Sequence, residues 1–317
     1  MRKWLPLLWL AVVVAAAWVL ADRLRAIDFR EVVAAVRAQP RHAVLSALAC
    51  CFGVYALVGS YEGIAVRIAT GRRMFLMPLR TALIANPLGR AIGASFVSSG
   101  ALRYRMYSAA GMSLAQIAAI VVLAAMPYVF AVGWLIDLSL LFNARIAGTA
   151  LRLPTNVVVT FGAIGLVKDI GWLVLVAVRK APLVVRGRKI PLVKLRDALL
   201  QIAIGVVQIT LMAGILHAFM PSDLGMGWPH FVAIYCIAFV AGQVSNIPAG
   251  LGVLEAALLL MLPHVPPAKL LAAVLAYRAV YELLPILIAL VLLAAYETMH
   301  PQGFMRRWLQ SLRTRAP

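Results

Sequence analysis

Long apolar runs separated by short basic segments organise this chain. The run Leu114–Ile136 contains no charged residue, and a helix of roughly 20 apolar residues is long enough to cross the hydrocarbon core of a bilayer. Other runs of comparable length are Trp4–Ala21, Ala43–Val66, Val157–Val178, Ala198–Met220 and Ala268–Tyr296. The pattern predicts an all-α membrane protein, a polytopic helical bundle with about six full spans.

Two further apolar segments, Met74–Gly100 and Phe231–Leu262, are interrupted by helix-breaking residues. In the second segment, Pro248, Gly250 and Gly252 follow one another closely. These residues free backbone groups from helical pairing, and lipid cannot satisfy such groups, so the break must be buried in protein or face a wet cavity. We expect a broken helix that turns back within the membrane, with its second half starting near Gly252.

Charges in the connecting segments orient the spans. Residues 221–230 hold Asp223 and no Lys or Arg, as an external loop does, whereas Arg179–Arg196 and the tail 301–317 are rich in basic residues, as cytoplasmic segments are. With these sides assigned, the two interrupted segments enter the membrane from opposite faces and turn back. Two such re-entrant elements are typical of an inverted-repeat transporter. We expect cytoplasmic N- and C-termini and one transmembrane domain over residues 1–300, followed by the basic tail.

Composition and charge exclude several classes of function. Of 317 residues, 64% are hydrophobic and 13% are charged, and the mean hydropathy is +0.94, which a soluble domain could not accommodate. We attribute the formal net charge of +19 to helix orientation and contact with anionic lipid heads, and not to nucleic-acid binding. Cys50, Cys51 and Cys236 form no CxxC pair, so no metal or other cofactor is predicted. Without a nucleotide-binding loop or a catalytic constellation, we expect neither an ATP-driven pump nor an enzyme.

The break in the second interrupted segment carries candidate binding groups. Glu255 lies in the first turn after Gly252, where its charge favours the positive end of a helix and can meet the ammonium group of a lipid. The alternative is a buried carboxylate that pairs with Arg278 and holds the fold. Gly250 and Gly252 can expose backbone amides to a phosphate, or they can allow close helix packing instead.

Two arginines and two other polar residues extend this list. Arg278 and Glu282 are four residues apart, so they share a helix face and can form an ion pair that is either structural or functional. Arg90, one turn after Asn86, can clamp a phosphate through its guanidinium, or it can reach the membrane interface if the segment is shallow.

Arg103 and Arg105 are placed just cytoplasmic of a span. They can draw an anionic lipid head towards a cavity, or simply anchor the helix by the positive-inside rule. Glu62, Asp137 and the adjacent pair Lys168 and Asp169 lie in or near spans and can relay protons if transport is coupled to a gradient. Adjacent residues do not face each other on a helix, so Lys168 and Asp169 are expected to find partners on other helices.

Three separated pieces of the chain resemble one known family. They are NPLGRAIGASFVSSGALRYRMYSAAGMS (Asn86–Ser113), SNIPAGLGVLEAALL (Ser245–Leu259) and YRAVYELLP (Tyr277–Pro285). Together they resemble the transmembrane flippase domain of the multiple peptide resistance factors, the lysylphosphatidylglycerol synthases. The resemblance implies movement of an aminoacylated phospholipid from the inner to the outer leaflet. The sequence ends about twenty residues after its last span, so the soluble synthase activity of that family is not expected here.

The resulting interpretation is a bacterial inner-membrane flippase for aminoacylated phosphatidylglycerol or a related envelope lipid. In it, Arg90, Arg103, Arg105 and Arg278 lie near the lipid phosphate, and Glu255 or Glu282 lies near an amine. The alternative is a non-transporting accessory subunit that assists a lipid-synthesising enzyme partner in an envelope-lipid or glycolipid system. Such a subunit would tolerate neutral replacements at Glu255 and Arg278, whereas a flippase would not.

Overall fold

Five helices cross the molecule from end to end. The computed structural model describes residues 30, 34, 37–92, 95–151, 153–178, 183–185, 188–190, 195–245 and 250–299. Within these ranges, five helical stretches are long and apolar enough to cross a membrane. They are α3 (Arg41–Thr70), α6 (Leu114–Phe142), α8 (Thr155–Val178), α9 (Leu195–His217) and the continuous stretch Pro267–Thr298. The protein is therefore an all-α polytopic membrane protein. The predicted span Trp4–Ala21 and the tail 301–317 lie outside the described residues.

Helix α6 is longer than the sequence pattern predicts. It begins at a capping box, in which the Ser113 hydroxyl accepts from the Gln116 amide and the Gln116 side chain accepts from the Ser113 amide. The predicted span ended at Ile136 because Asp137 follows it, but the helix continues to Phe142. Asp137 is tolerated inside the helix because Lys168 of α8 lies 3.6 Å from its carboxylate.

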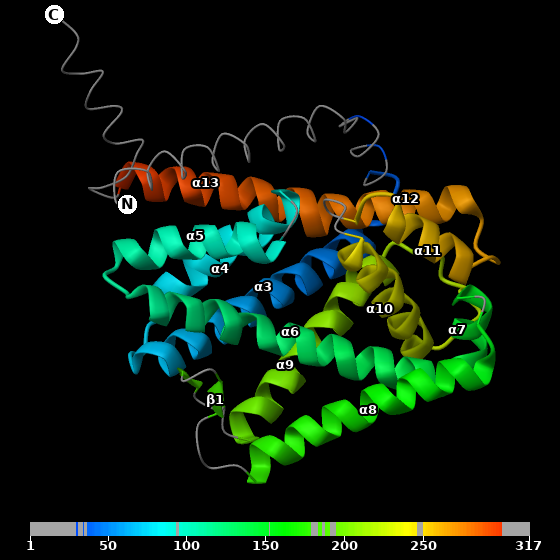
Figure 1. Ribbon diagram of the computed structural model, residues 1–317. Helices are drawn as coiled ribbons and strands as arrows, with labels where there is room; N and C mark the ends of the chain where they lie inside the picture. The colour runs from blue at the N-terminus through cyan, green and yellow to red at the C-terminus, as the bar shows by residue number, and fades with distance from the viewer. Residues whose placement is uncertain are drawn as a thin grey trace, which may run out of the picture.

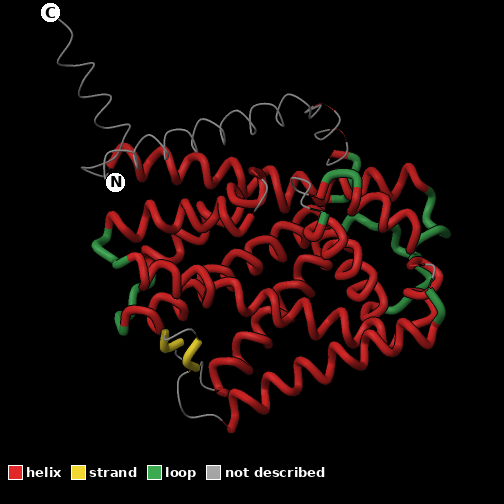
Figure 2. Tube along the Cα trace, viewed as in Figure 1, coloured by secondary structure: helices red, strands yellow, loops and turns green. Residues whose placement is uncertain are grey.

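Two helical hairpins fill the space between the long helices. One hairpin joins α4 (Leu76–Ile92) to α5 (Ser95–Ala109), and the other joins α10 (Trp228–Val244) to α11 (Val253–Met261). The two hairpins extend towards each other from opposite ends of the bundle, and the described ends of their helices that approach each other lie near its middle (Figures 1 and 2). Helices of 17 and 15 residues are shorter than the roughly 20 residues that a full span requires. Re-entrant insertion and an inverted repeat stay predictions.

The first interrupted segment forms a pair of helices, as the sequence predicts, although not every helix-breaking residue in it ends a helix. Helix α4 runs through Pro87 and Gly89 to Ile92. A Cβ atom at Gly89 would lie 2.7 Å from the Cβ of Ser99 on α5, so this glycine allows the two arms of the hairpin to pack closely. In the second hairpin, residues 246–249, including Pro248, lie outside the described residues.

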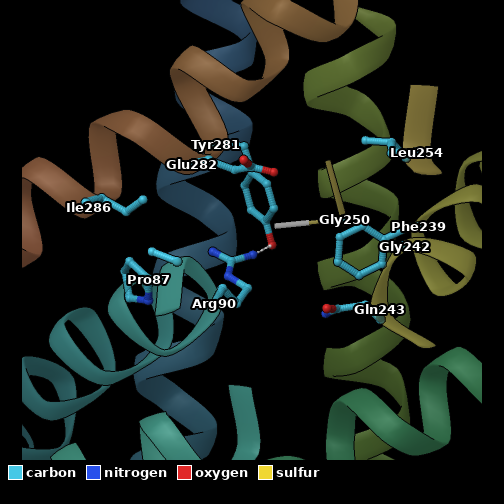
Figure 3. Close-up of a pocket in the computed structure, with 11 residues that line it drawn as sticks. Pro87, Arg90, Phe239, Gly242, Gln243, Gly250, Leu254, Tyr281, Glu282 and Ile286 are labelled. Atoms are coloured by element: carbon cyan, nitrogen blue, oxygen red, sulfur yellow. Dashed lines mark hydrogen bonds between the residues drawn. The ribbon is translucent and has the colours of Figure 1, made fainter. Parts of the chain in front are cut away.

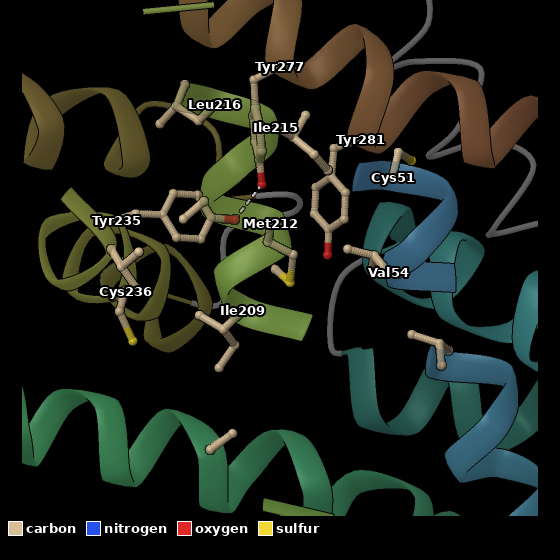
Figure 4. Close-up of a cluster of buried hydrophobic side chains, with 14 of the residues drawn as sticks. Cys51, Val54, Ile209, Met212, Ile215, Leu216, Tyr235, Cys236, Tyr277 and Tyr281 are labelled. Atoms are coloured by element: carbon tan, nitrogen blue, oxygen red, sulfur yellow. Dashed lines mark hydrogen bonds between the residues drawn. The ribbon is translucent and has the colours of Figure 1, made fainter. Parts of the chain in front are cut away.

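The main core packs α3, α9, α10 and the last span together. Met212, Ile215 and Leu216 of α9 are buried between the tyrosines of α10 and of the last span, as Figure 4 shows. The hydroxyls of Tyr235 and Tyr277 lie 2.7 Å apart within this cluster. The hydrogen bond gives these two buried hydroxyls a partner, and it ties α10 to the last span.

The last span contains a π-helical turn for an identifiable reason. It consists of α12 (Pro267–Arg278), the π-turn η2 (Ala279–Leu283) and α13 (Leu284–Met299). The amide of Leu284 bonds to the carbonyl of Ala279, five residues earlier, and Pro285 has no N–H to donate. The carbonyl of Val280 is therefore available, and it accepts a hydrogen bond from the thiol of Cys51 on α3 at 3.4 Å.

A short antiparallel hairpin interrupts the otherwise helical fold. Strand β1 (Leu183–Val185) pairs with β2 (Arg188–Ile190), with Leu183 opposite Ile190. It lies in the basic connection between α8 and α9 that the sequence analysis assigned to the cytoplasmic side.

Candidate functional site

Two adjoining pockets lie between the hairpins. Both are lined by Arg90 of α4, Phe239 and Gln243 of α10, and Tyr281 of η2. The larger pocket has an empty volume of about 950 Å³ and the smaller about 530 Å³, and each is partly open to the surroundings. The π-turn η2 and the adjoining ends of the hairpin helices form the walls of these pockets. Non-helical backbone within a membrane must be buried in protein or line a cavity. This arrangement meets that requirement. We refer to the two pockets together as the hairpin cavity.

Arg90 is the central cation of the hairpin cavity. Its guanidinium donates to the hydroxyls of Tyr281 and of Tyr55, the second at 2.7 Å, and it also lies over the Tyr281 ring, 4.4 Å from the centroid. Figure 3 places Arg90 and Gln243 on facing sides of the smaller pocket. Among the described residues, no carboxylate lies within 4.0 Å of Arg90. Its positive charge is thus held by neutral groups and directed at the cavity.

A second arginine of the same cavity is fully paired. Arg103 of α5 donates twice to Glu62 of α3, at 2.8 Å and 2.8 Å, and both side chains are buried. Tyr107 donates to the same carboxylate at 3.0 Å, and Asn86 accepts from Arg103 at 3.4 Å. The bidentate geometry with two more hydrogen bonds is what a buried ion pair needs in order to offset its desolvation.

Arg103 and Arg105 lie on the same helix in different surroundings. Both belong to α5, which continues to Ala109, and their expected position just cytoplasmic of a span stays a prediction. Arg103 is buried because Glu62 supplies a partner inside the bundle. Arg105 contacts Glu297 of α13 at 3.1 Å, with both side chains partly exposed, and it does not line the hairpin cavity.

A three-residue ion cluster borders the smaller pocket. Arg278 binds both carboxylate oxygens of Glu255, at 2.8 Å and 3.0 Å, and also Glu282 at 3.0 Å. The ion pairs anticipated between Arg278 and each of these acids are therefore present. Glu282 lines the smaller pocket, so one acid of the cluster faces the space next to Arg90.

The glycines of the second break are engaged within the protein. Gly250 has a positive φ of 59°, and a Cβ atom there would lie 3.0 Å from the Cα of Gly242, which matches the close-packing alternative. The amide of Gly252 donates to Glu255 at 2.9 Å, as in a helix N-terminal capping contact. The Gly252 amide is therefore not presented to a ligand in this conformation.

The structure brings together most of the sequence-predicted residues and adds others. Asn86, Arg90, Arg103, Gly250 and Glu282 line the hairpin cavity, whereas Gly252, Glu255 and Arg278 adjoin it through the ion cluster. Several uncharged polar residues that line the cavity were not predicted from the sequence, namely Tyr55, Tyr61, Ser99, Tyr128, Gln208 and Gln243. A polar residue near the end of an apolar helix, such as Gln243 on α10, could have indicated such a lining residue from the sequence.

Comparisons with known proteins fit a membrane protein of this class. No family model matches the sequence. The chain is 29% identical over 227 residues to the uncharacterized protein slr0712 of Synechocystis, covering 68% of this chain and 67% of that protein. It is 26% identical over 278 residues to the inner membrane protein YbhN of Escherichia coli, covering 84% and 83%. Neither of these two names describes an enzyme.

A shorter match reaches a lipid-modifying protein. The chain is 39% identical over 72 residues to the phosphatidylglycerol lysyltransferase of Staphylococcus haemolyticus. The match covers 22% of this chain and 9% of the lysyltransferase. It therefore concerns one segment of each protein and carries over no activity by itself.

Proposed function

We propose that this protein translocates a phospholipid across a bacterial inner membrane. The observation that carries the proposal is Arg90, a partly buried guanidinium held by tyrosine hydroxyls at a cavity between two helical hairpins. A guanidinium without a carboxylate partner is suited to a phosphate, which it can bind through two parallel hydrogen bonds. The match to a phosphatidylglycerol lysyltransferase over 72 residues supports a phospholipid as the substrate class.

The acid that faces the smaller pocket extends the proposal to the rest of the head group. Glu282 lines the same pocket as Arg90, and an aminoacylated phosphatidylglycerol carries an ammonium group besides its phosphate. The phosphate would bind at Arg90 and the ammonium at Glu282. A zwitterionic or cationic lipid head would then find both charges complemented in one cavity.

The hairpins supply a route to both leaflets. If both are re-entrant, each tip ends near the middle of the membrane and the cavity lies where the tips meet. Rocking of one hairpin and its supporting spans against the other would open the cavity to one leaflet and then to the other. Cytoplasmic N- and C-termini belong to this proposal.

Lipid flipping in liposomes tests the proposal. Purified protein is reconstituted with fluorescent phosphatidylglycerol or lysylphosphatidylglycerol, and the label in the outer leaflet is quenched. Protein-dependent flipping is expected for the wild type. Arg90→Gln should slow it by about tenfold or more, because a charge-assisted pair contributes about 1.5–3 kcal/mol. Arg105→Gln is the matched control, since it removes an arginine outside the cavity.

The ion cluster provides the second comparison. Glu255→Gln and Arg278→Ala should also slow flipping if the cluster moves with the cavity during transport. No flipping of either lipid by folded wild-type protein would overturn the proposal. Equal rates for Arg90→Gln and Arg105→Gln would remove Arg90 from the path. Either result would favour an accessory subunit that acts with a lipid-synthesising enzyme.

A further inference from the structure

A second group of charges lies between α6 and α8, away from the hairpin cavity. Lys168 of α8 lies 3.1 Å from the carboxylate of its neighbour Asp169 and 3.6 Å from that of Asp137 on α6. The sequence predicts that Lys168 and Asp169 find their partners on other helices. Lys168 does reach α6, but it also turns back to Asp169, because its long side chain can bend around its own helix.

Two glycines build this site in a reciprocal manner. The motif Gly-x-x-x-Asp occurs on both helices, as Gly133 with Asp137 on α6 and as Gly165 with Asp169 on α8. A Cβ atom at Gly165 would lie 2.1 Å from an Asp137 oxygen, and one at Gly133 would lie 3.2 Å from an Asp169 oxygen. Each aspartate therefore lies over the glycine of the facing helix, and any side chain at Gly165 would displace the Asp137 carboxylate.

The charges of this site do not balance. Asp137 and Asp169 are largely buried, with side chains 10% and 3% exposed, whereas Lys168 is 63% exposed. One ammonium and two carboxylates leave a net charge of −1 inside a membrane protein, which is costly. One buried oxygen of each carboxylate, Oδ2, also lacks a hydrogen bond from any described residue. Within the described part of the chain, the site is therefore short of one positive charge and of at least one hydrogen-bond donor.

A bound proton supplies both the positive charge and the hydrogen-bond donor, and it fits this site better than a metal ion does. When one carboxylate takes up H⁺, it becomes a neutral O–H donor, and the net charge changes from −1 to zero. A metal cation would have to lie beside the ammonium group of Lys168, which repels it. Helices α3, α5, α7, α9 and α10 also pack against α6 or α8. Their described titratable groups include Glu62 and Arg67 of α3, Arg103 and Arg105 of α5, Arg145 of α7, Arg196, Asp197 and His217 of α9, and His230 of α10. The ion pairs of the two carboxylates include none of them.

We propose that Asp137 and Asp169 form a proton-binding site that couples translocation to a transmembrane proton gradient. The coupling rests on the proposed flippase function, whereas proton binding itself does not. Helix α6 connects the two sites, because Val129 of α6 lines the hairpin cavity and Asp137 follows eight residues later, about 12 Å along the axis. Uptake of a proton weakens the ionic contact across α6 and α8 and changes how firmly α6 is held.

Infrared spectroscopy of the reconstituted protein tests proton binding without any lipid assay. The C=O stretching band of a protonated carboxyl group is followed against pH. The wild type should retain one such band near neutral pH. Asp137→Asn and Asp169→Asn should each abolish it completely, because the remaining carboxylate is then neutralised by Lys168. Lys168→Met should roughly double it, since two carboxylates then lack a cation. Asp223→Asn, which changes a loop residue, is the control.

Flipping measured with and without a proton gradient tests the coupling. The gradient should accelerate flipping several-fold in the wild type, and Asp169→Asn should keep the basal rate but lose this acceleration. Gly165→Ala should behave like Asp169→Asn because it displaces the Asp137 carboxylate. Gly171→Ala on the same helix should not, since a Cβ atom there meets nothing within 4 Å.

The two measurements separate the possible failures. If no protonated carboxyl band depends on Asp137 and Asp169, the proton site is wrong even where flipping occurs. A band that behaves as expected in a protein that flips no lipid would leave the proton site standing and overturn the proposed function. A correct band with gradient-independent flipping would overturn the coupling alone.

Discussion

Two arginines line the same pocket, and their charges are satisfied in opposite ways. Arg103 is bound by both oxygens of Glu62, with Tyr107 completing the carboxylate. Arg90 is held by two tyrosine hydroxyls. A buried arginine with a carboxylate has its binding capacity used within the fold, whereas one held by neutral groups keeps a charge that an incoming anion can meet. The comparison separates a structural cation from a candidate binding cation within a single cavity.

The largest expected effect comes from breaking the ion pair between Arg103 and Glu62. Glu62→Leu leaves Arg103 buried without a counter-ion, which should lower the free energy of unfolding by about 3–5 kcal/mol. Unfolding in mixtures of mild detergent and SDS measures it. The double change Glu62→Leu with Arg103→Met should recover most of the loss, because an apolar pair has no desolvation cost. A double variant as unstable as the single one would contradict a role confined to the ion pair.

The difference between the two arginines can also be removed by giving Arg90 a carboxylate partner, as Arg103 has. Gln243 lines both pockets with Arg90, so Gln243→Glu should neutralise the guanidinium and slow flipping of anionic lipid by about tenfold, equivalent to roughly 1.4 kcal/mol. Gln243→Met, which adds no charge, is the control for side-chain shape. Equal flipping rates for the two variants would show that the charge of Arg90 is not used.

A smaller effect is expected when one of the tyrosines that hold Arg90 is changed. Tyr55→Phe removes a hydrogen bond of 2.7 Å and should lower the free energy of unfolding by about 1.5–3 kcal/mol, the range for hydrogen bonds to charged groups. The same SDS titration measures it. Tyr104→Phe is the control, because the Tyr104 hydroxyl makes no hydrogen bond among the described residues. Equal losses in both variants would point to general packing instead.

The smallest effect belongs to the pair outside the cavity. Arg105 and Glu297 are partly exposed, and exposed ion pairs contribute about 0–1 kcal/mol. Arg105→Gln should therefore change the free energy of unfolding by less than about 1 kcal/mol, and high salt should shrink the difference further. A loss as large as that of Glu62→Leu would mean that the two arginines of α5 are equivalent.

Much of the fold was predictable because it depends on length and apolar composition. The predicted span Val157–Val178 agrees within two residues with α8, since nothing charged limits its ends before the loops. The end of α6 was predicted wrongly at Ile136, because an aspartate looks like a loop residue until its partner on α8 is known. Whether a segment forms a helix depends mainly on its own sequence. Whether a charged residue can lie inside that helix depends on a partner from another helix.

The candidate site was predictable only in part for the same reason. Arg90 and Glu282 were found because charges inside apolar segments are rare. The pairing of Arg278 with Glu255 was one of two alternatives, because both lie close to the same break. Glu62 and Arg103 are 41 residues apart, and helix periodicity indicates a face without identifying the helix that it meets. Their pairing therefore required the tertiary structure.

The π-helical turn of the last span has a consequence for how its two halves are oriented. One extra residue in a helical turn rotates everything after it by about 100° around the axis. The stretch before the turn, α12, packs on α9 and α11, whereas the stretch after it, α13, packs on α4. A single continuous helix thus presents a differently phased set of residues to each hairpin. A regular α-helix of the same sequence would turn the face of α13 that contacts α4 away from it by about 100°.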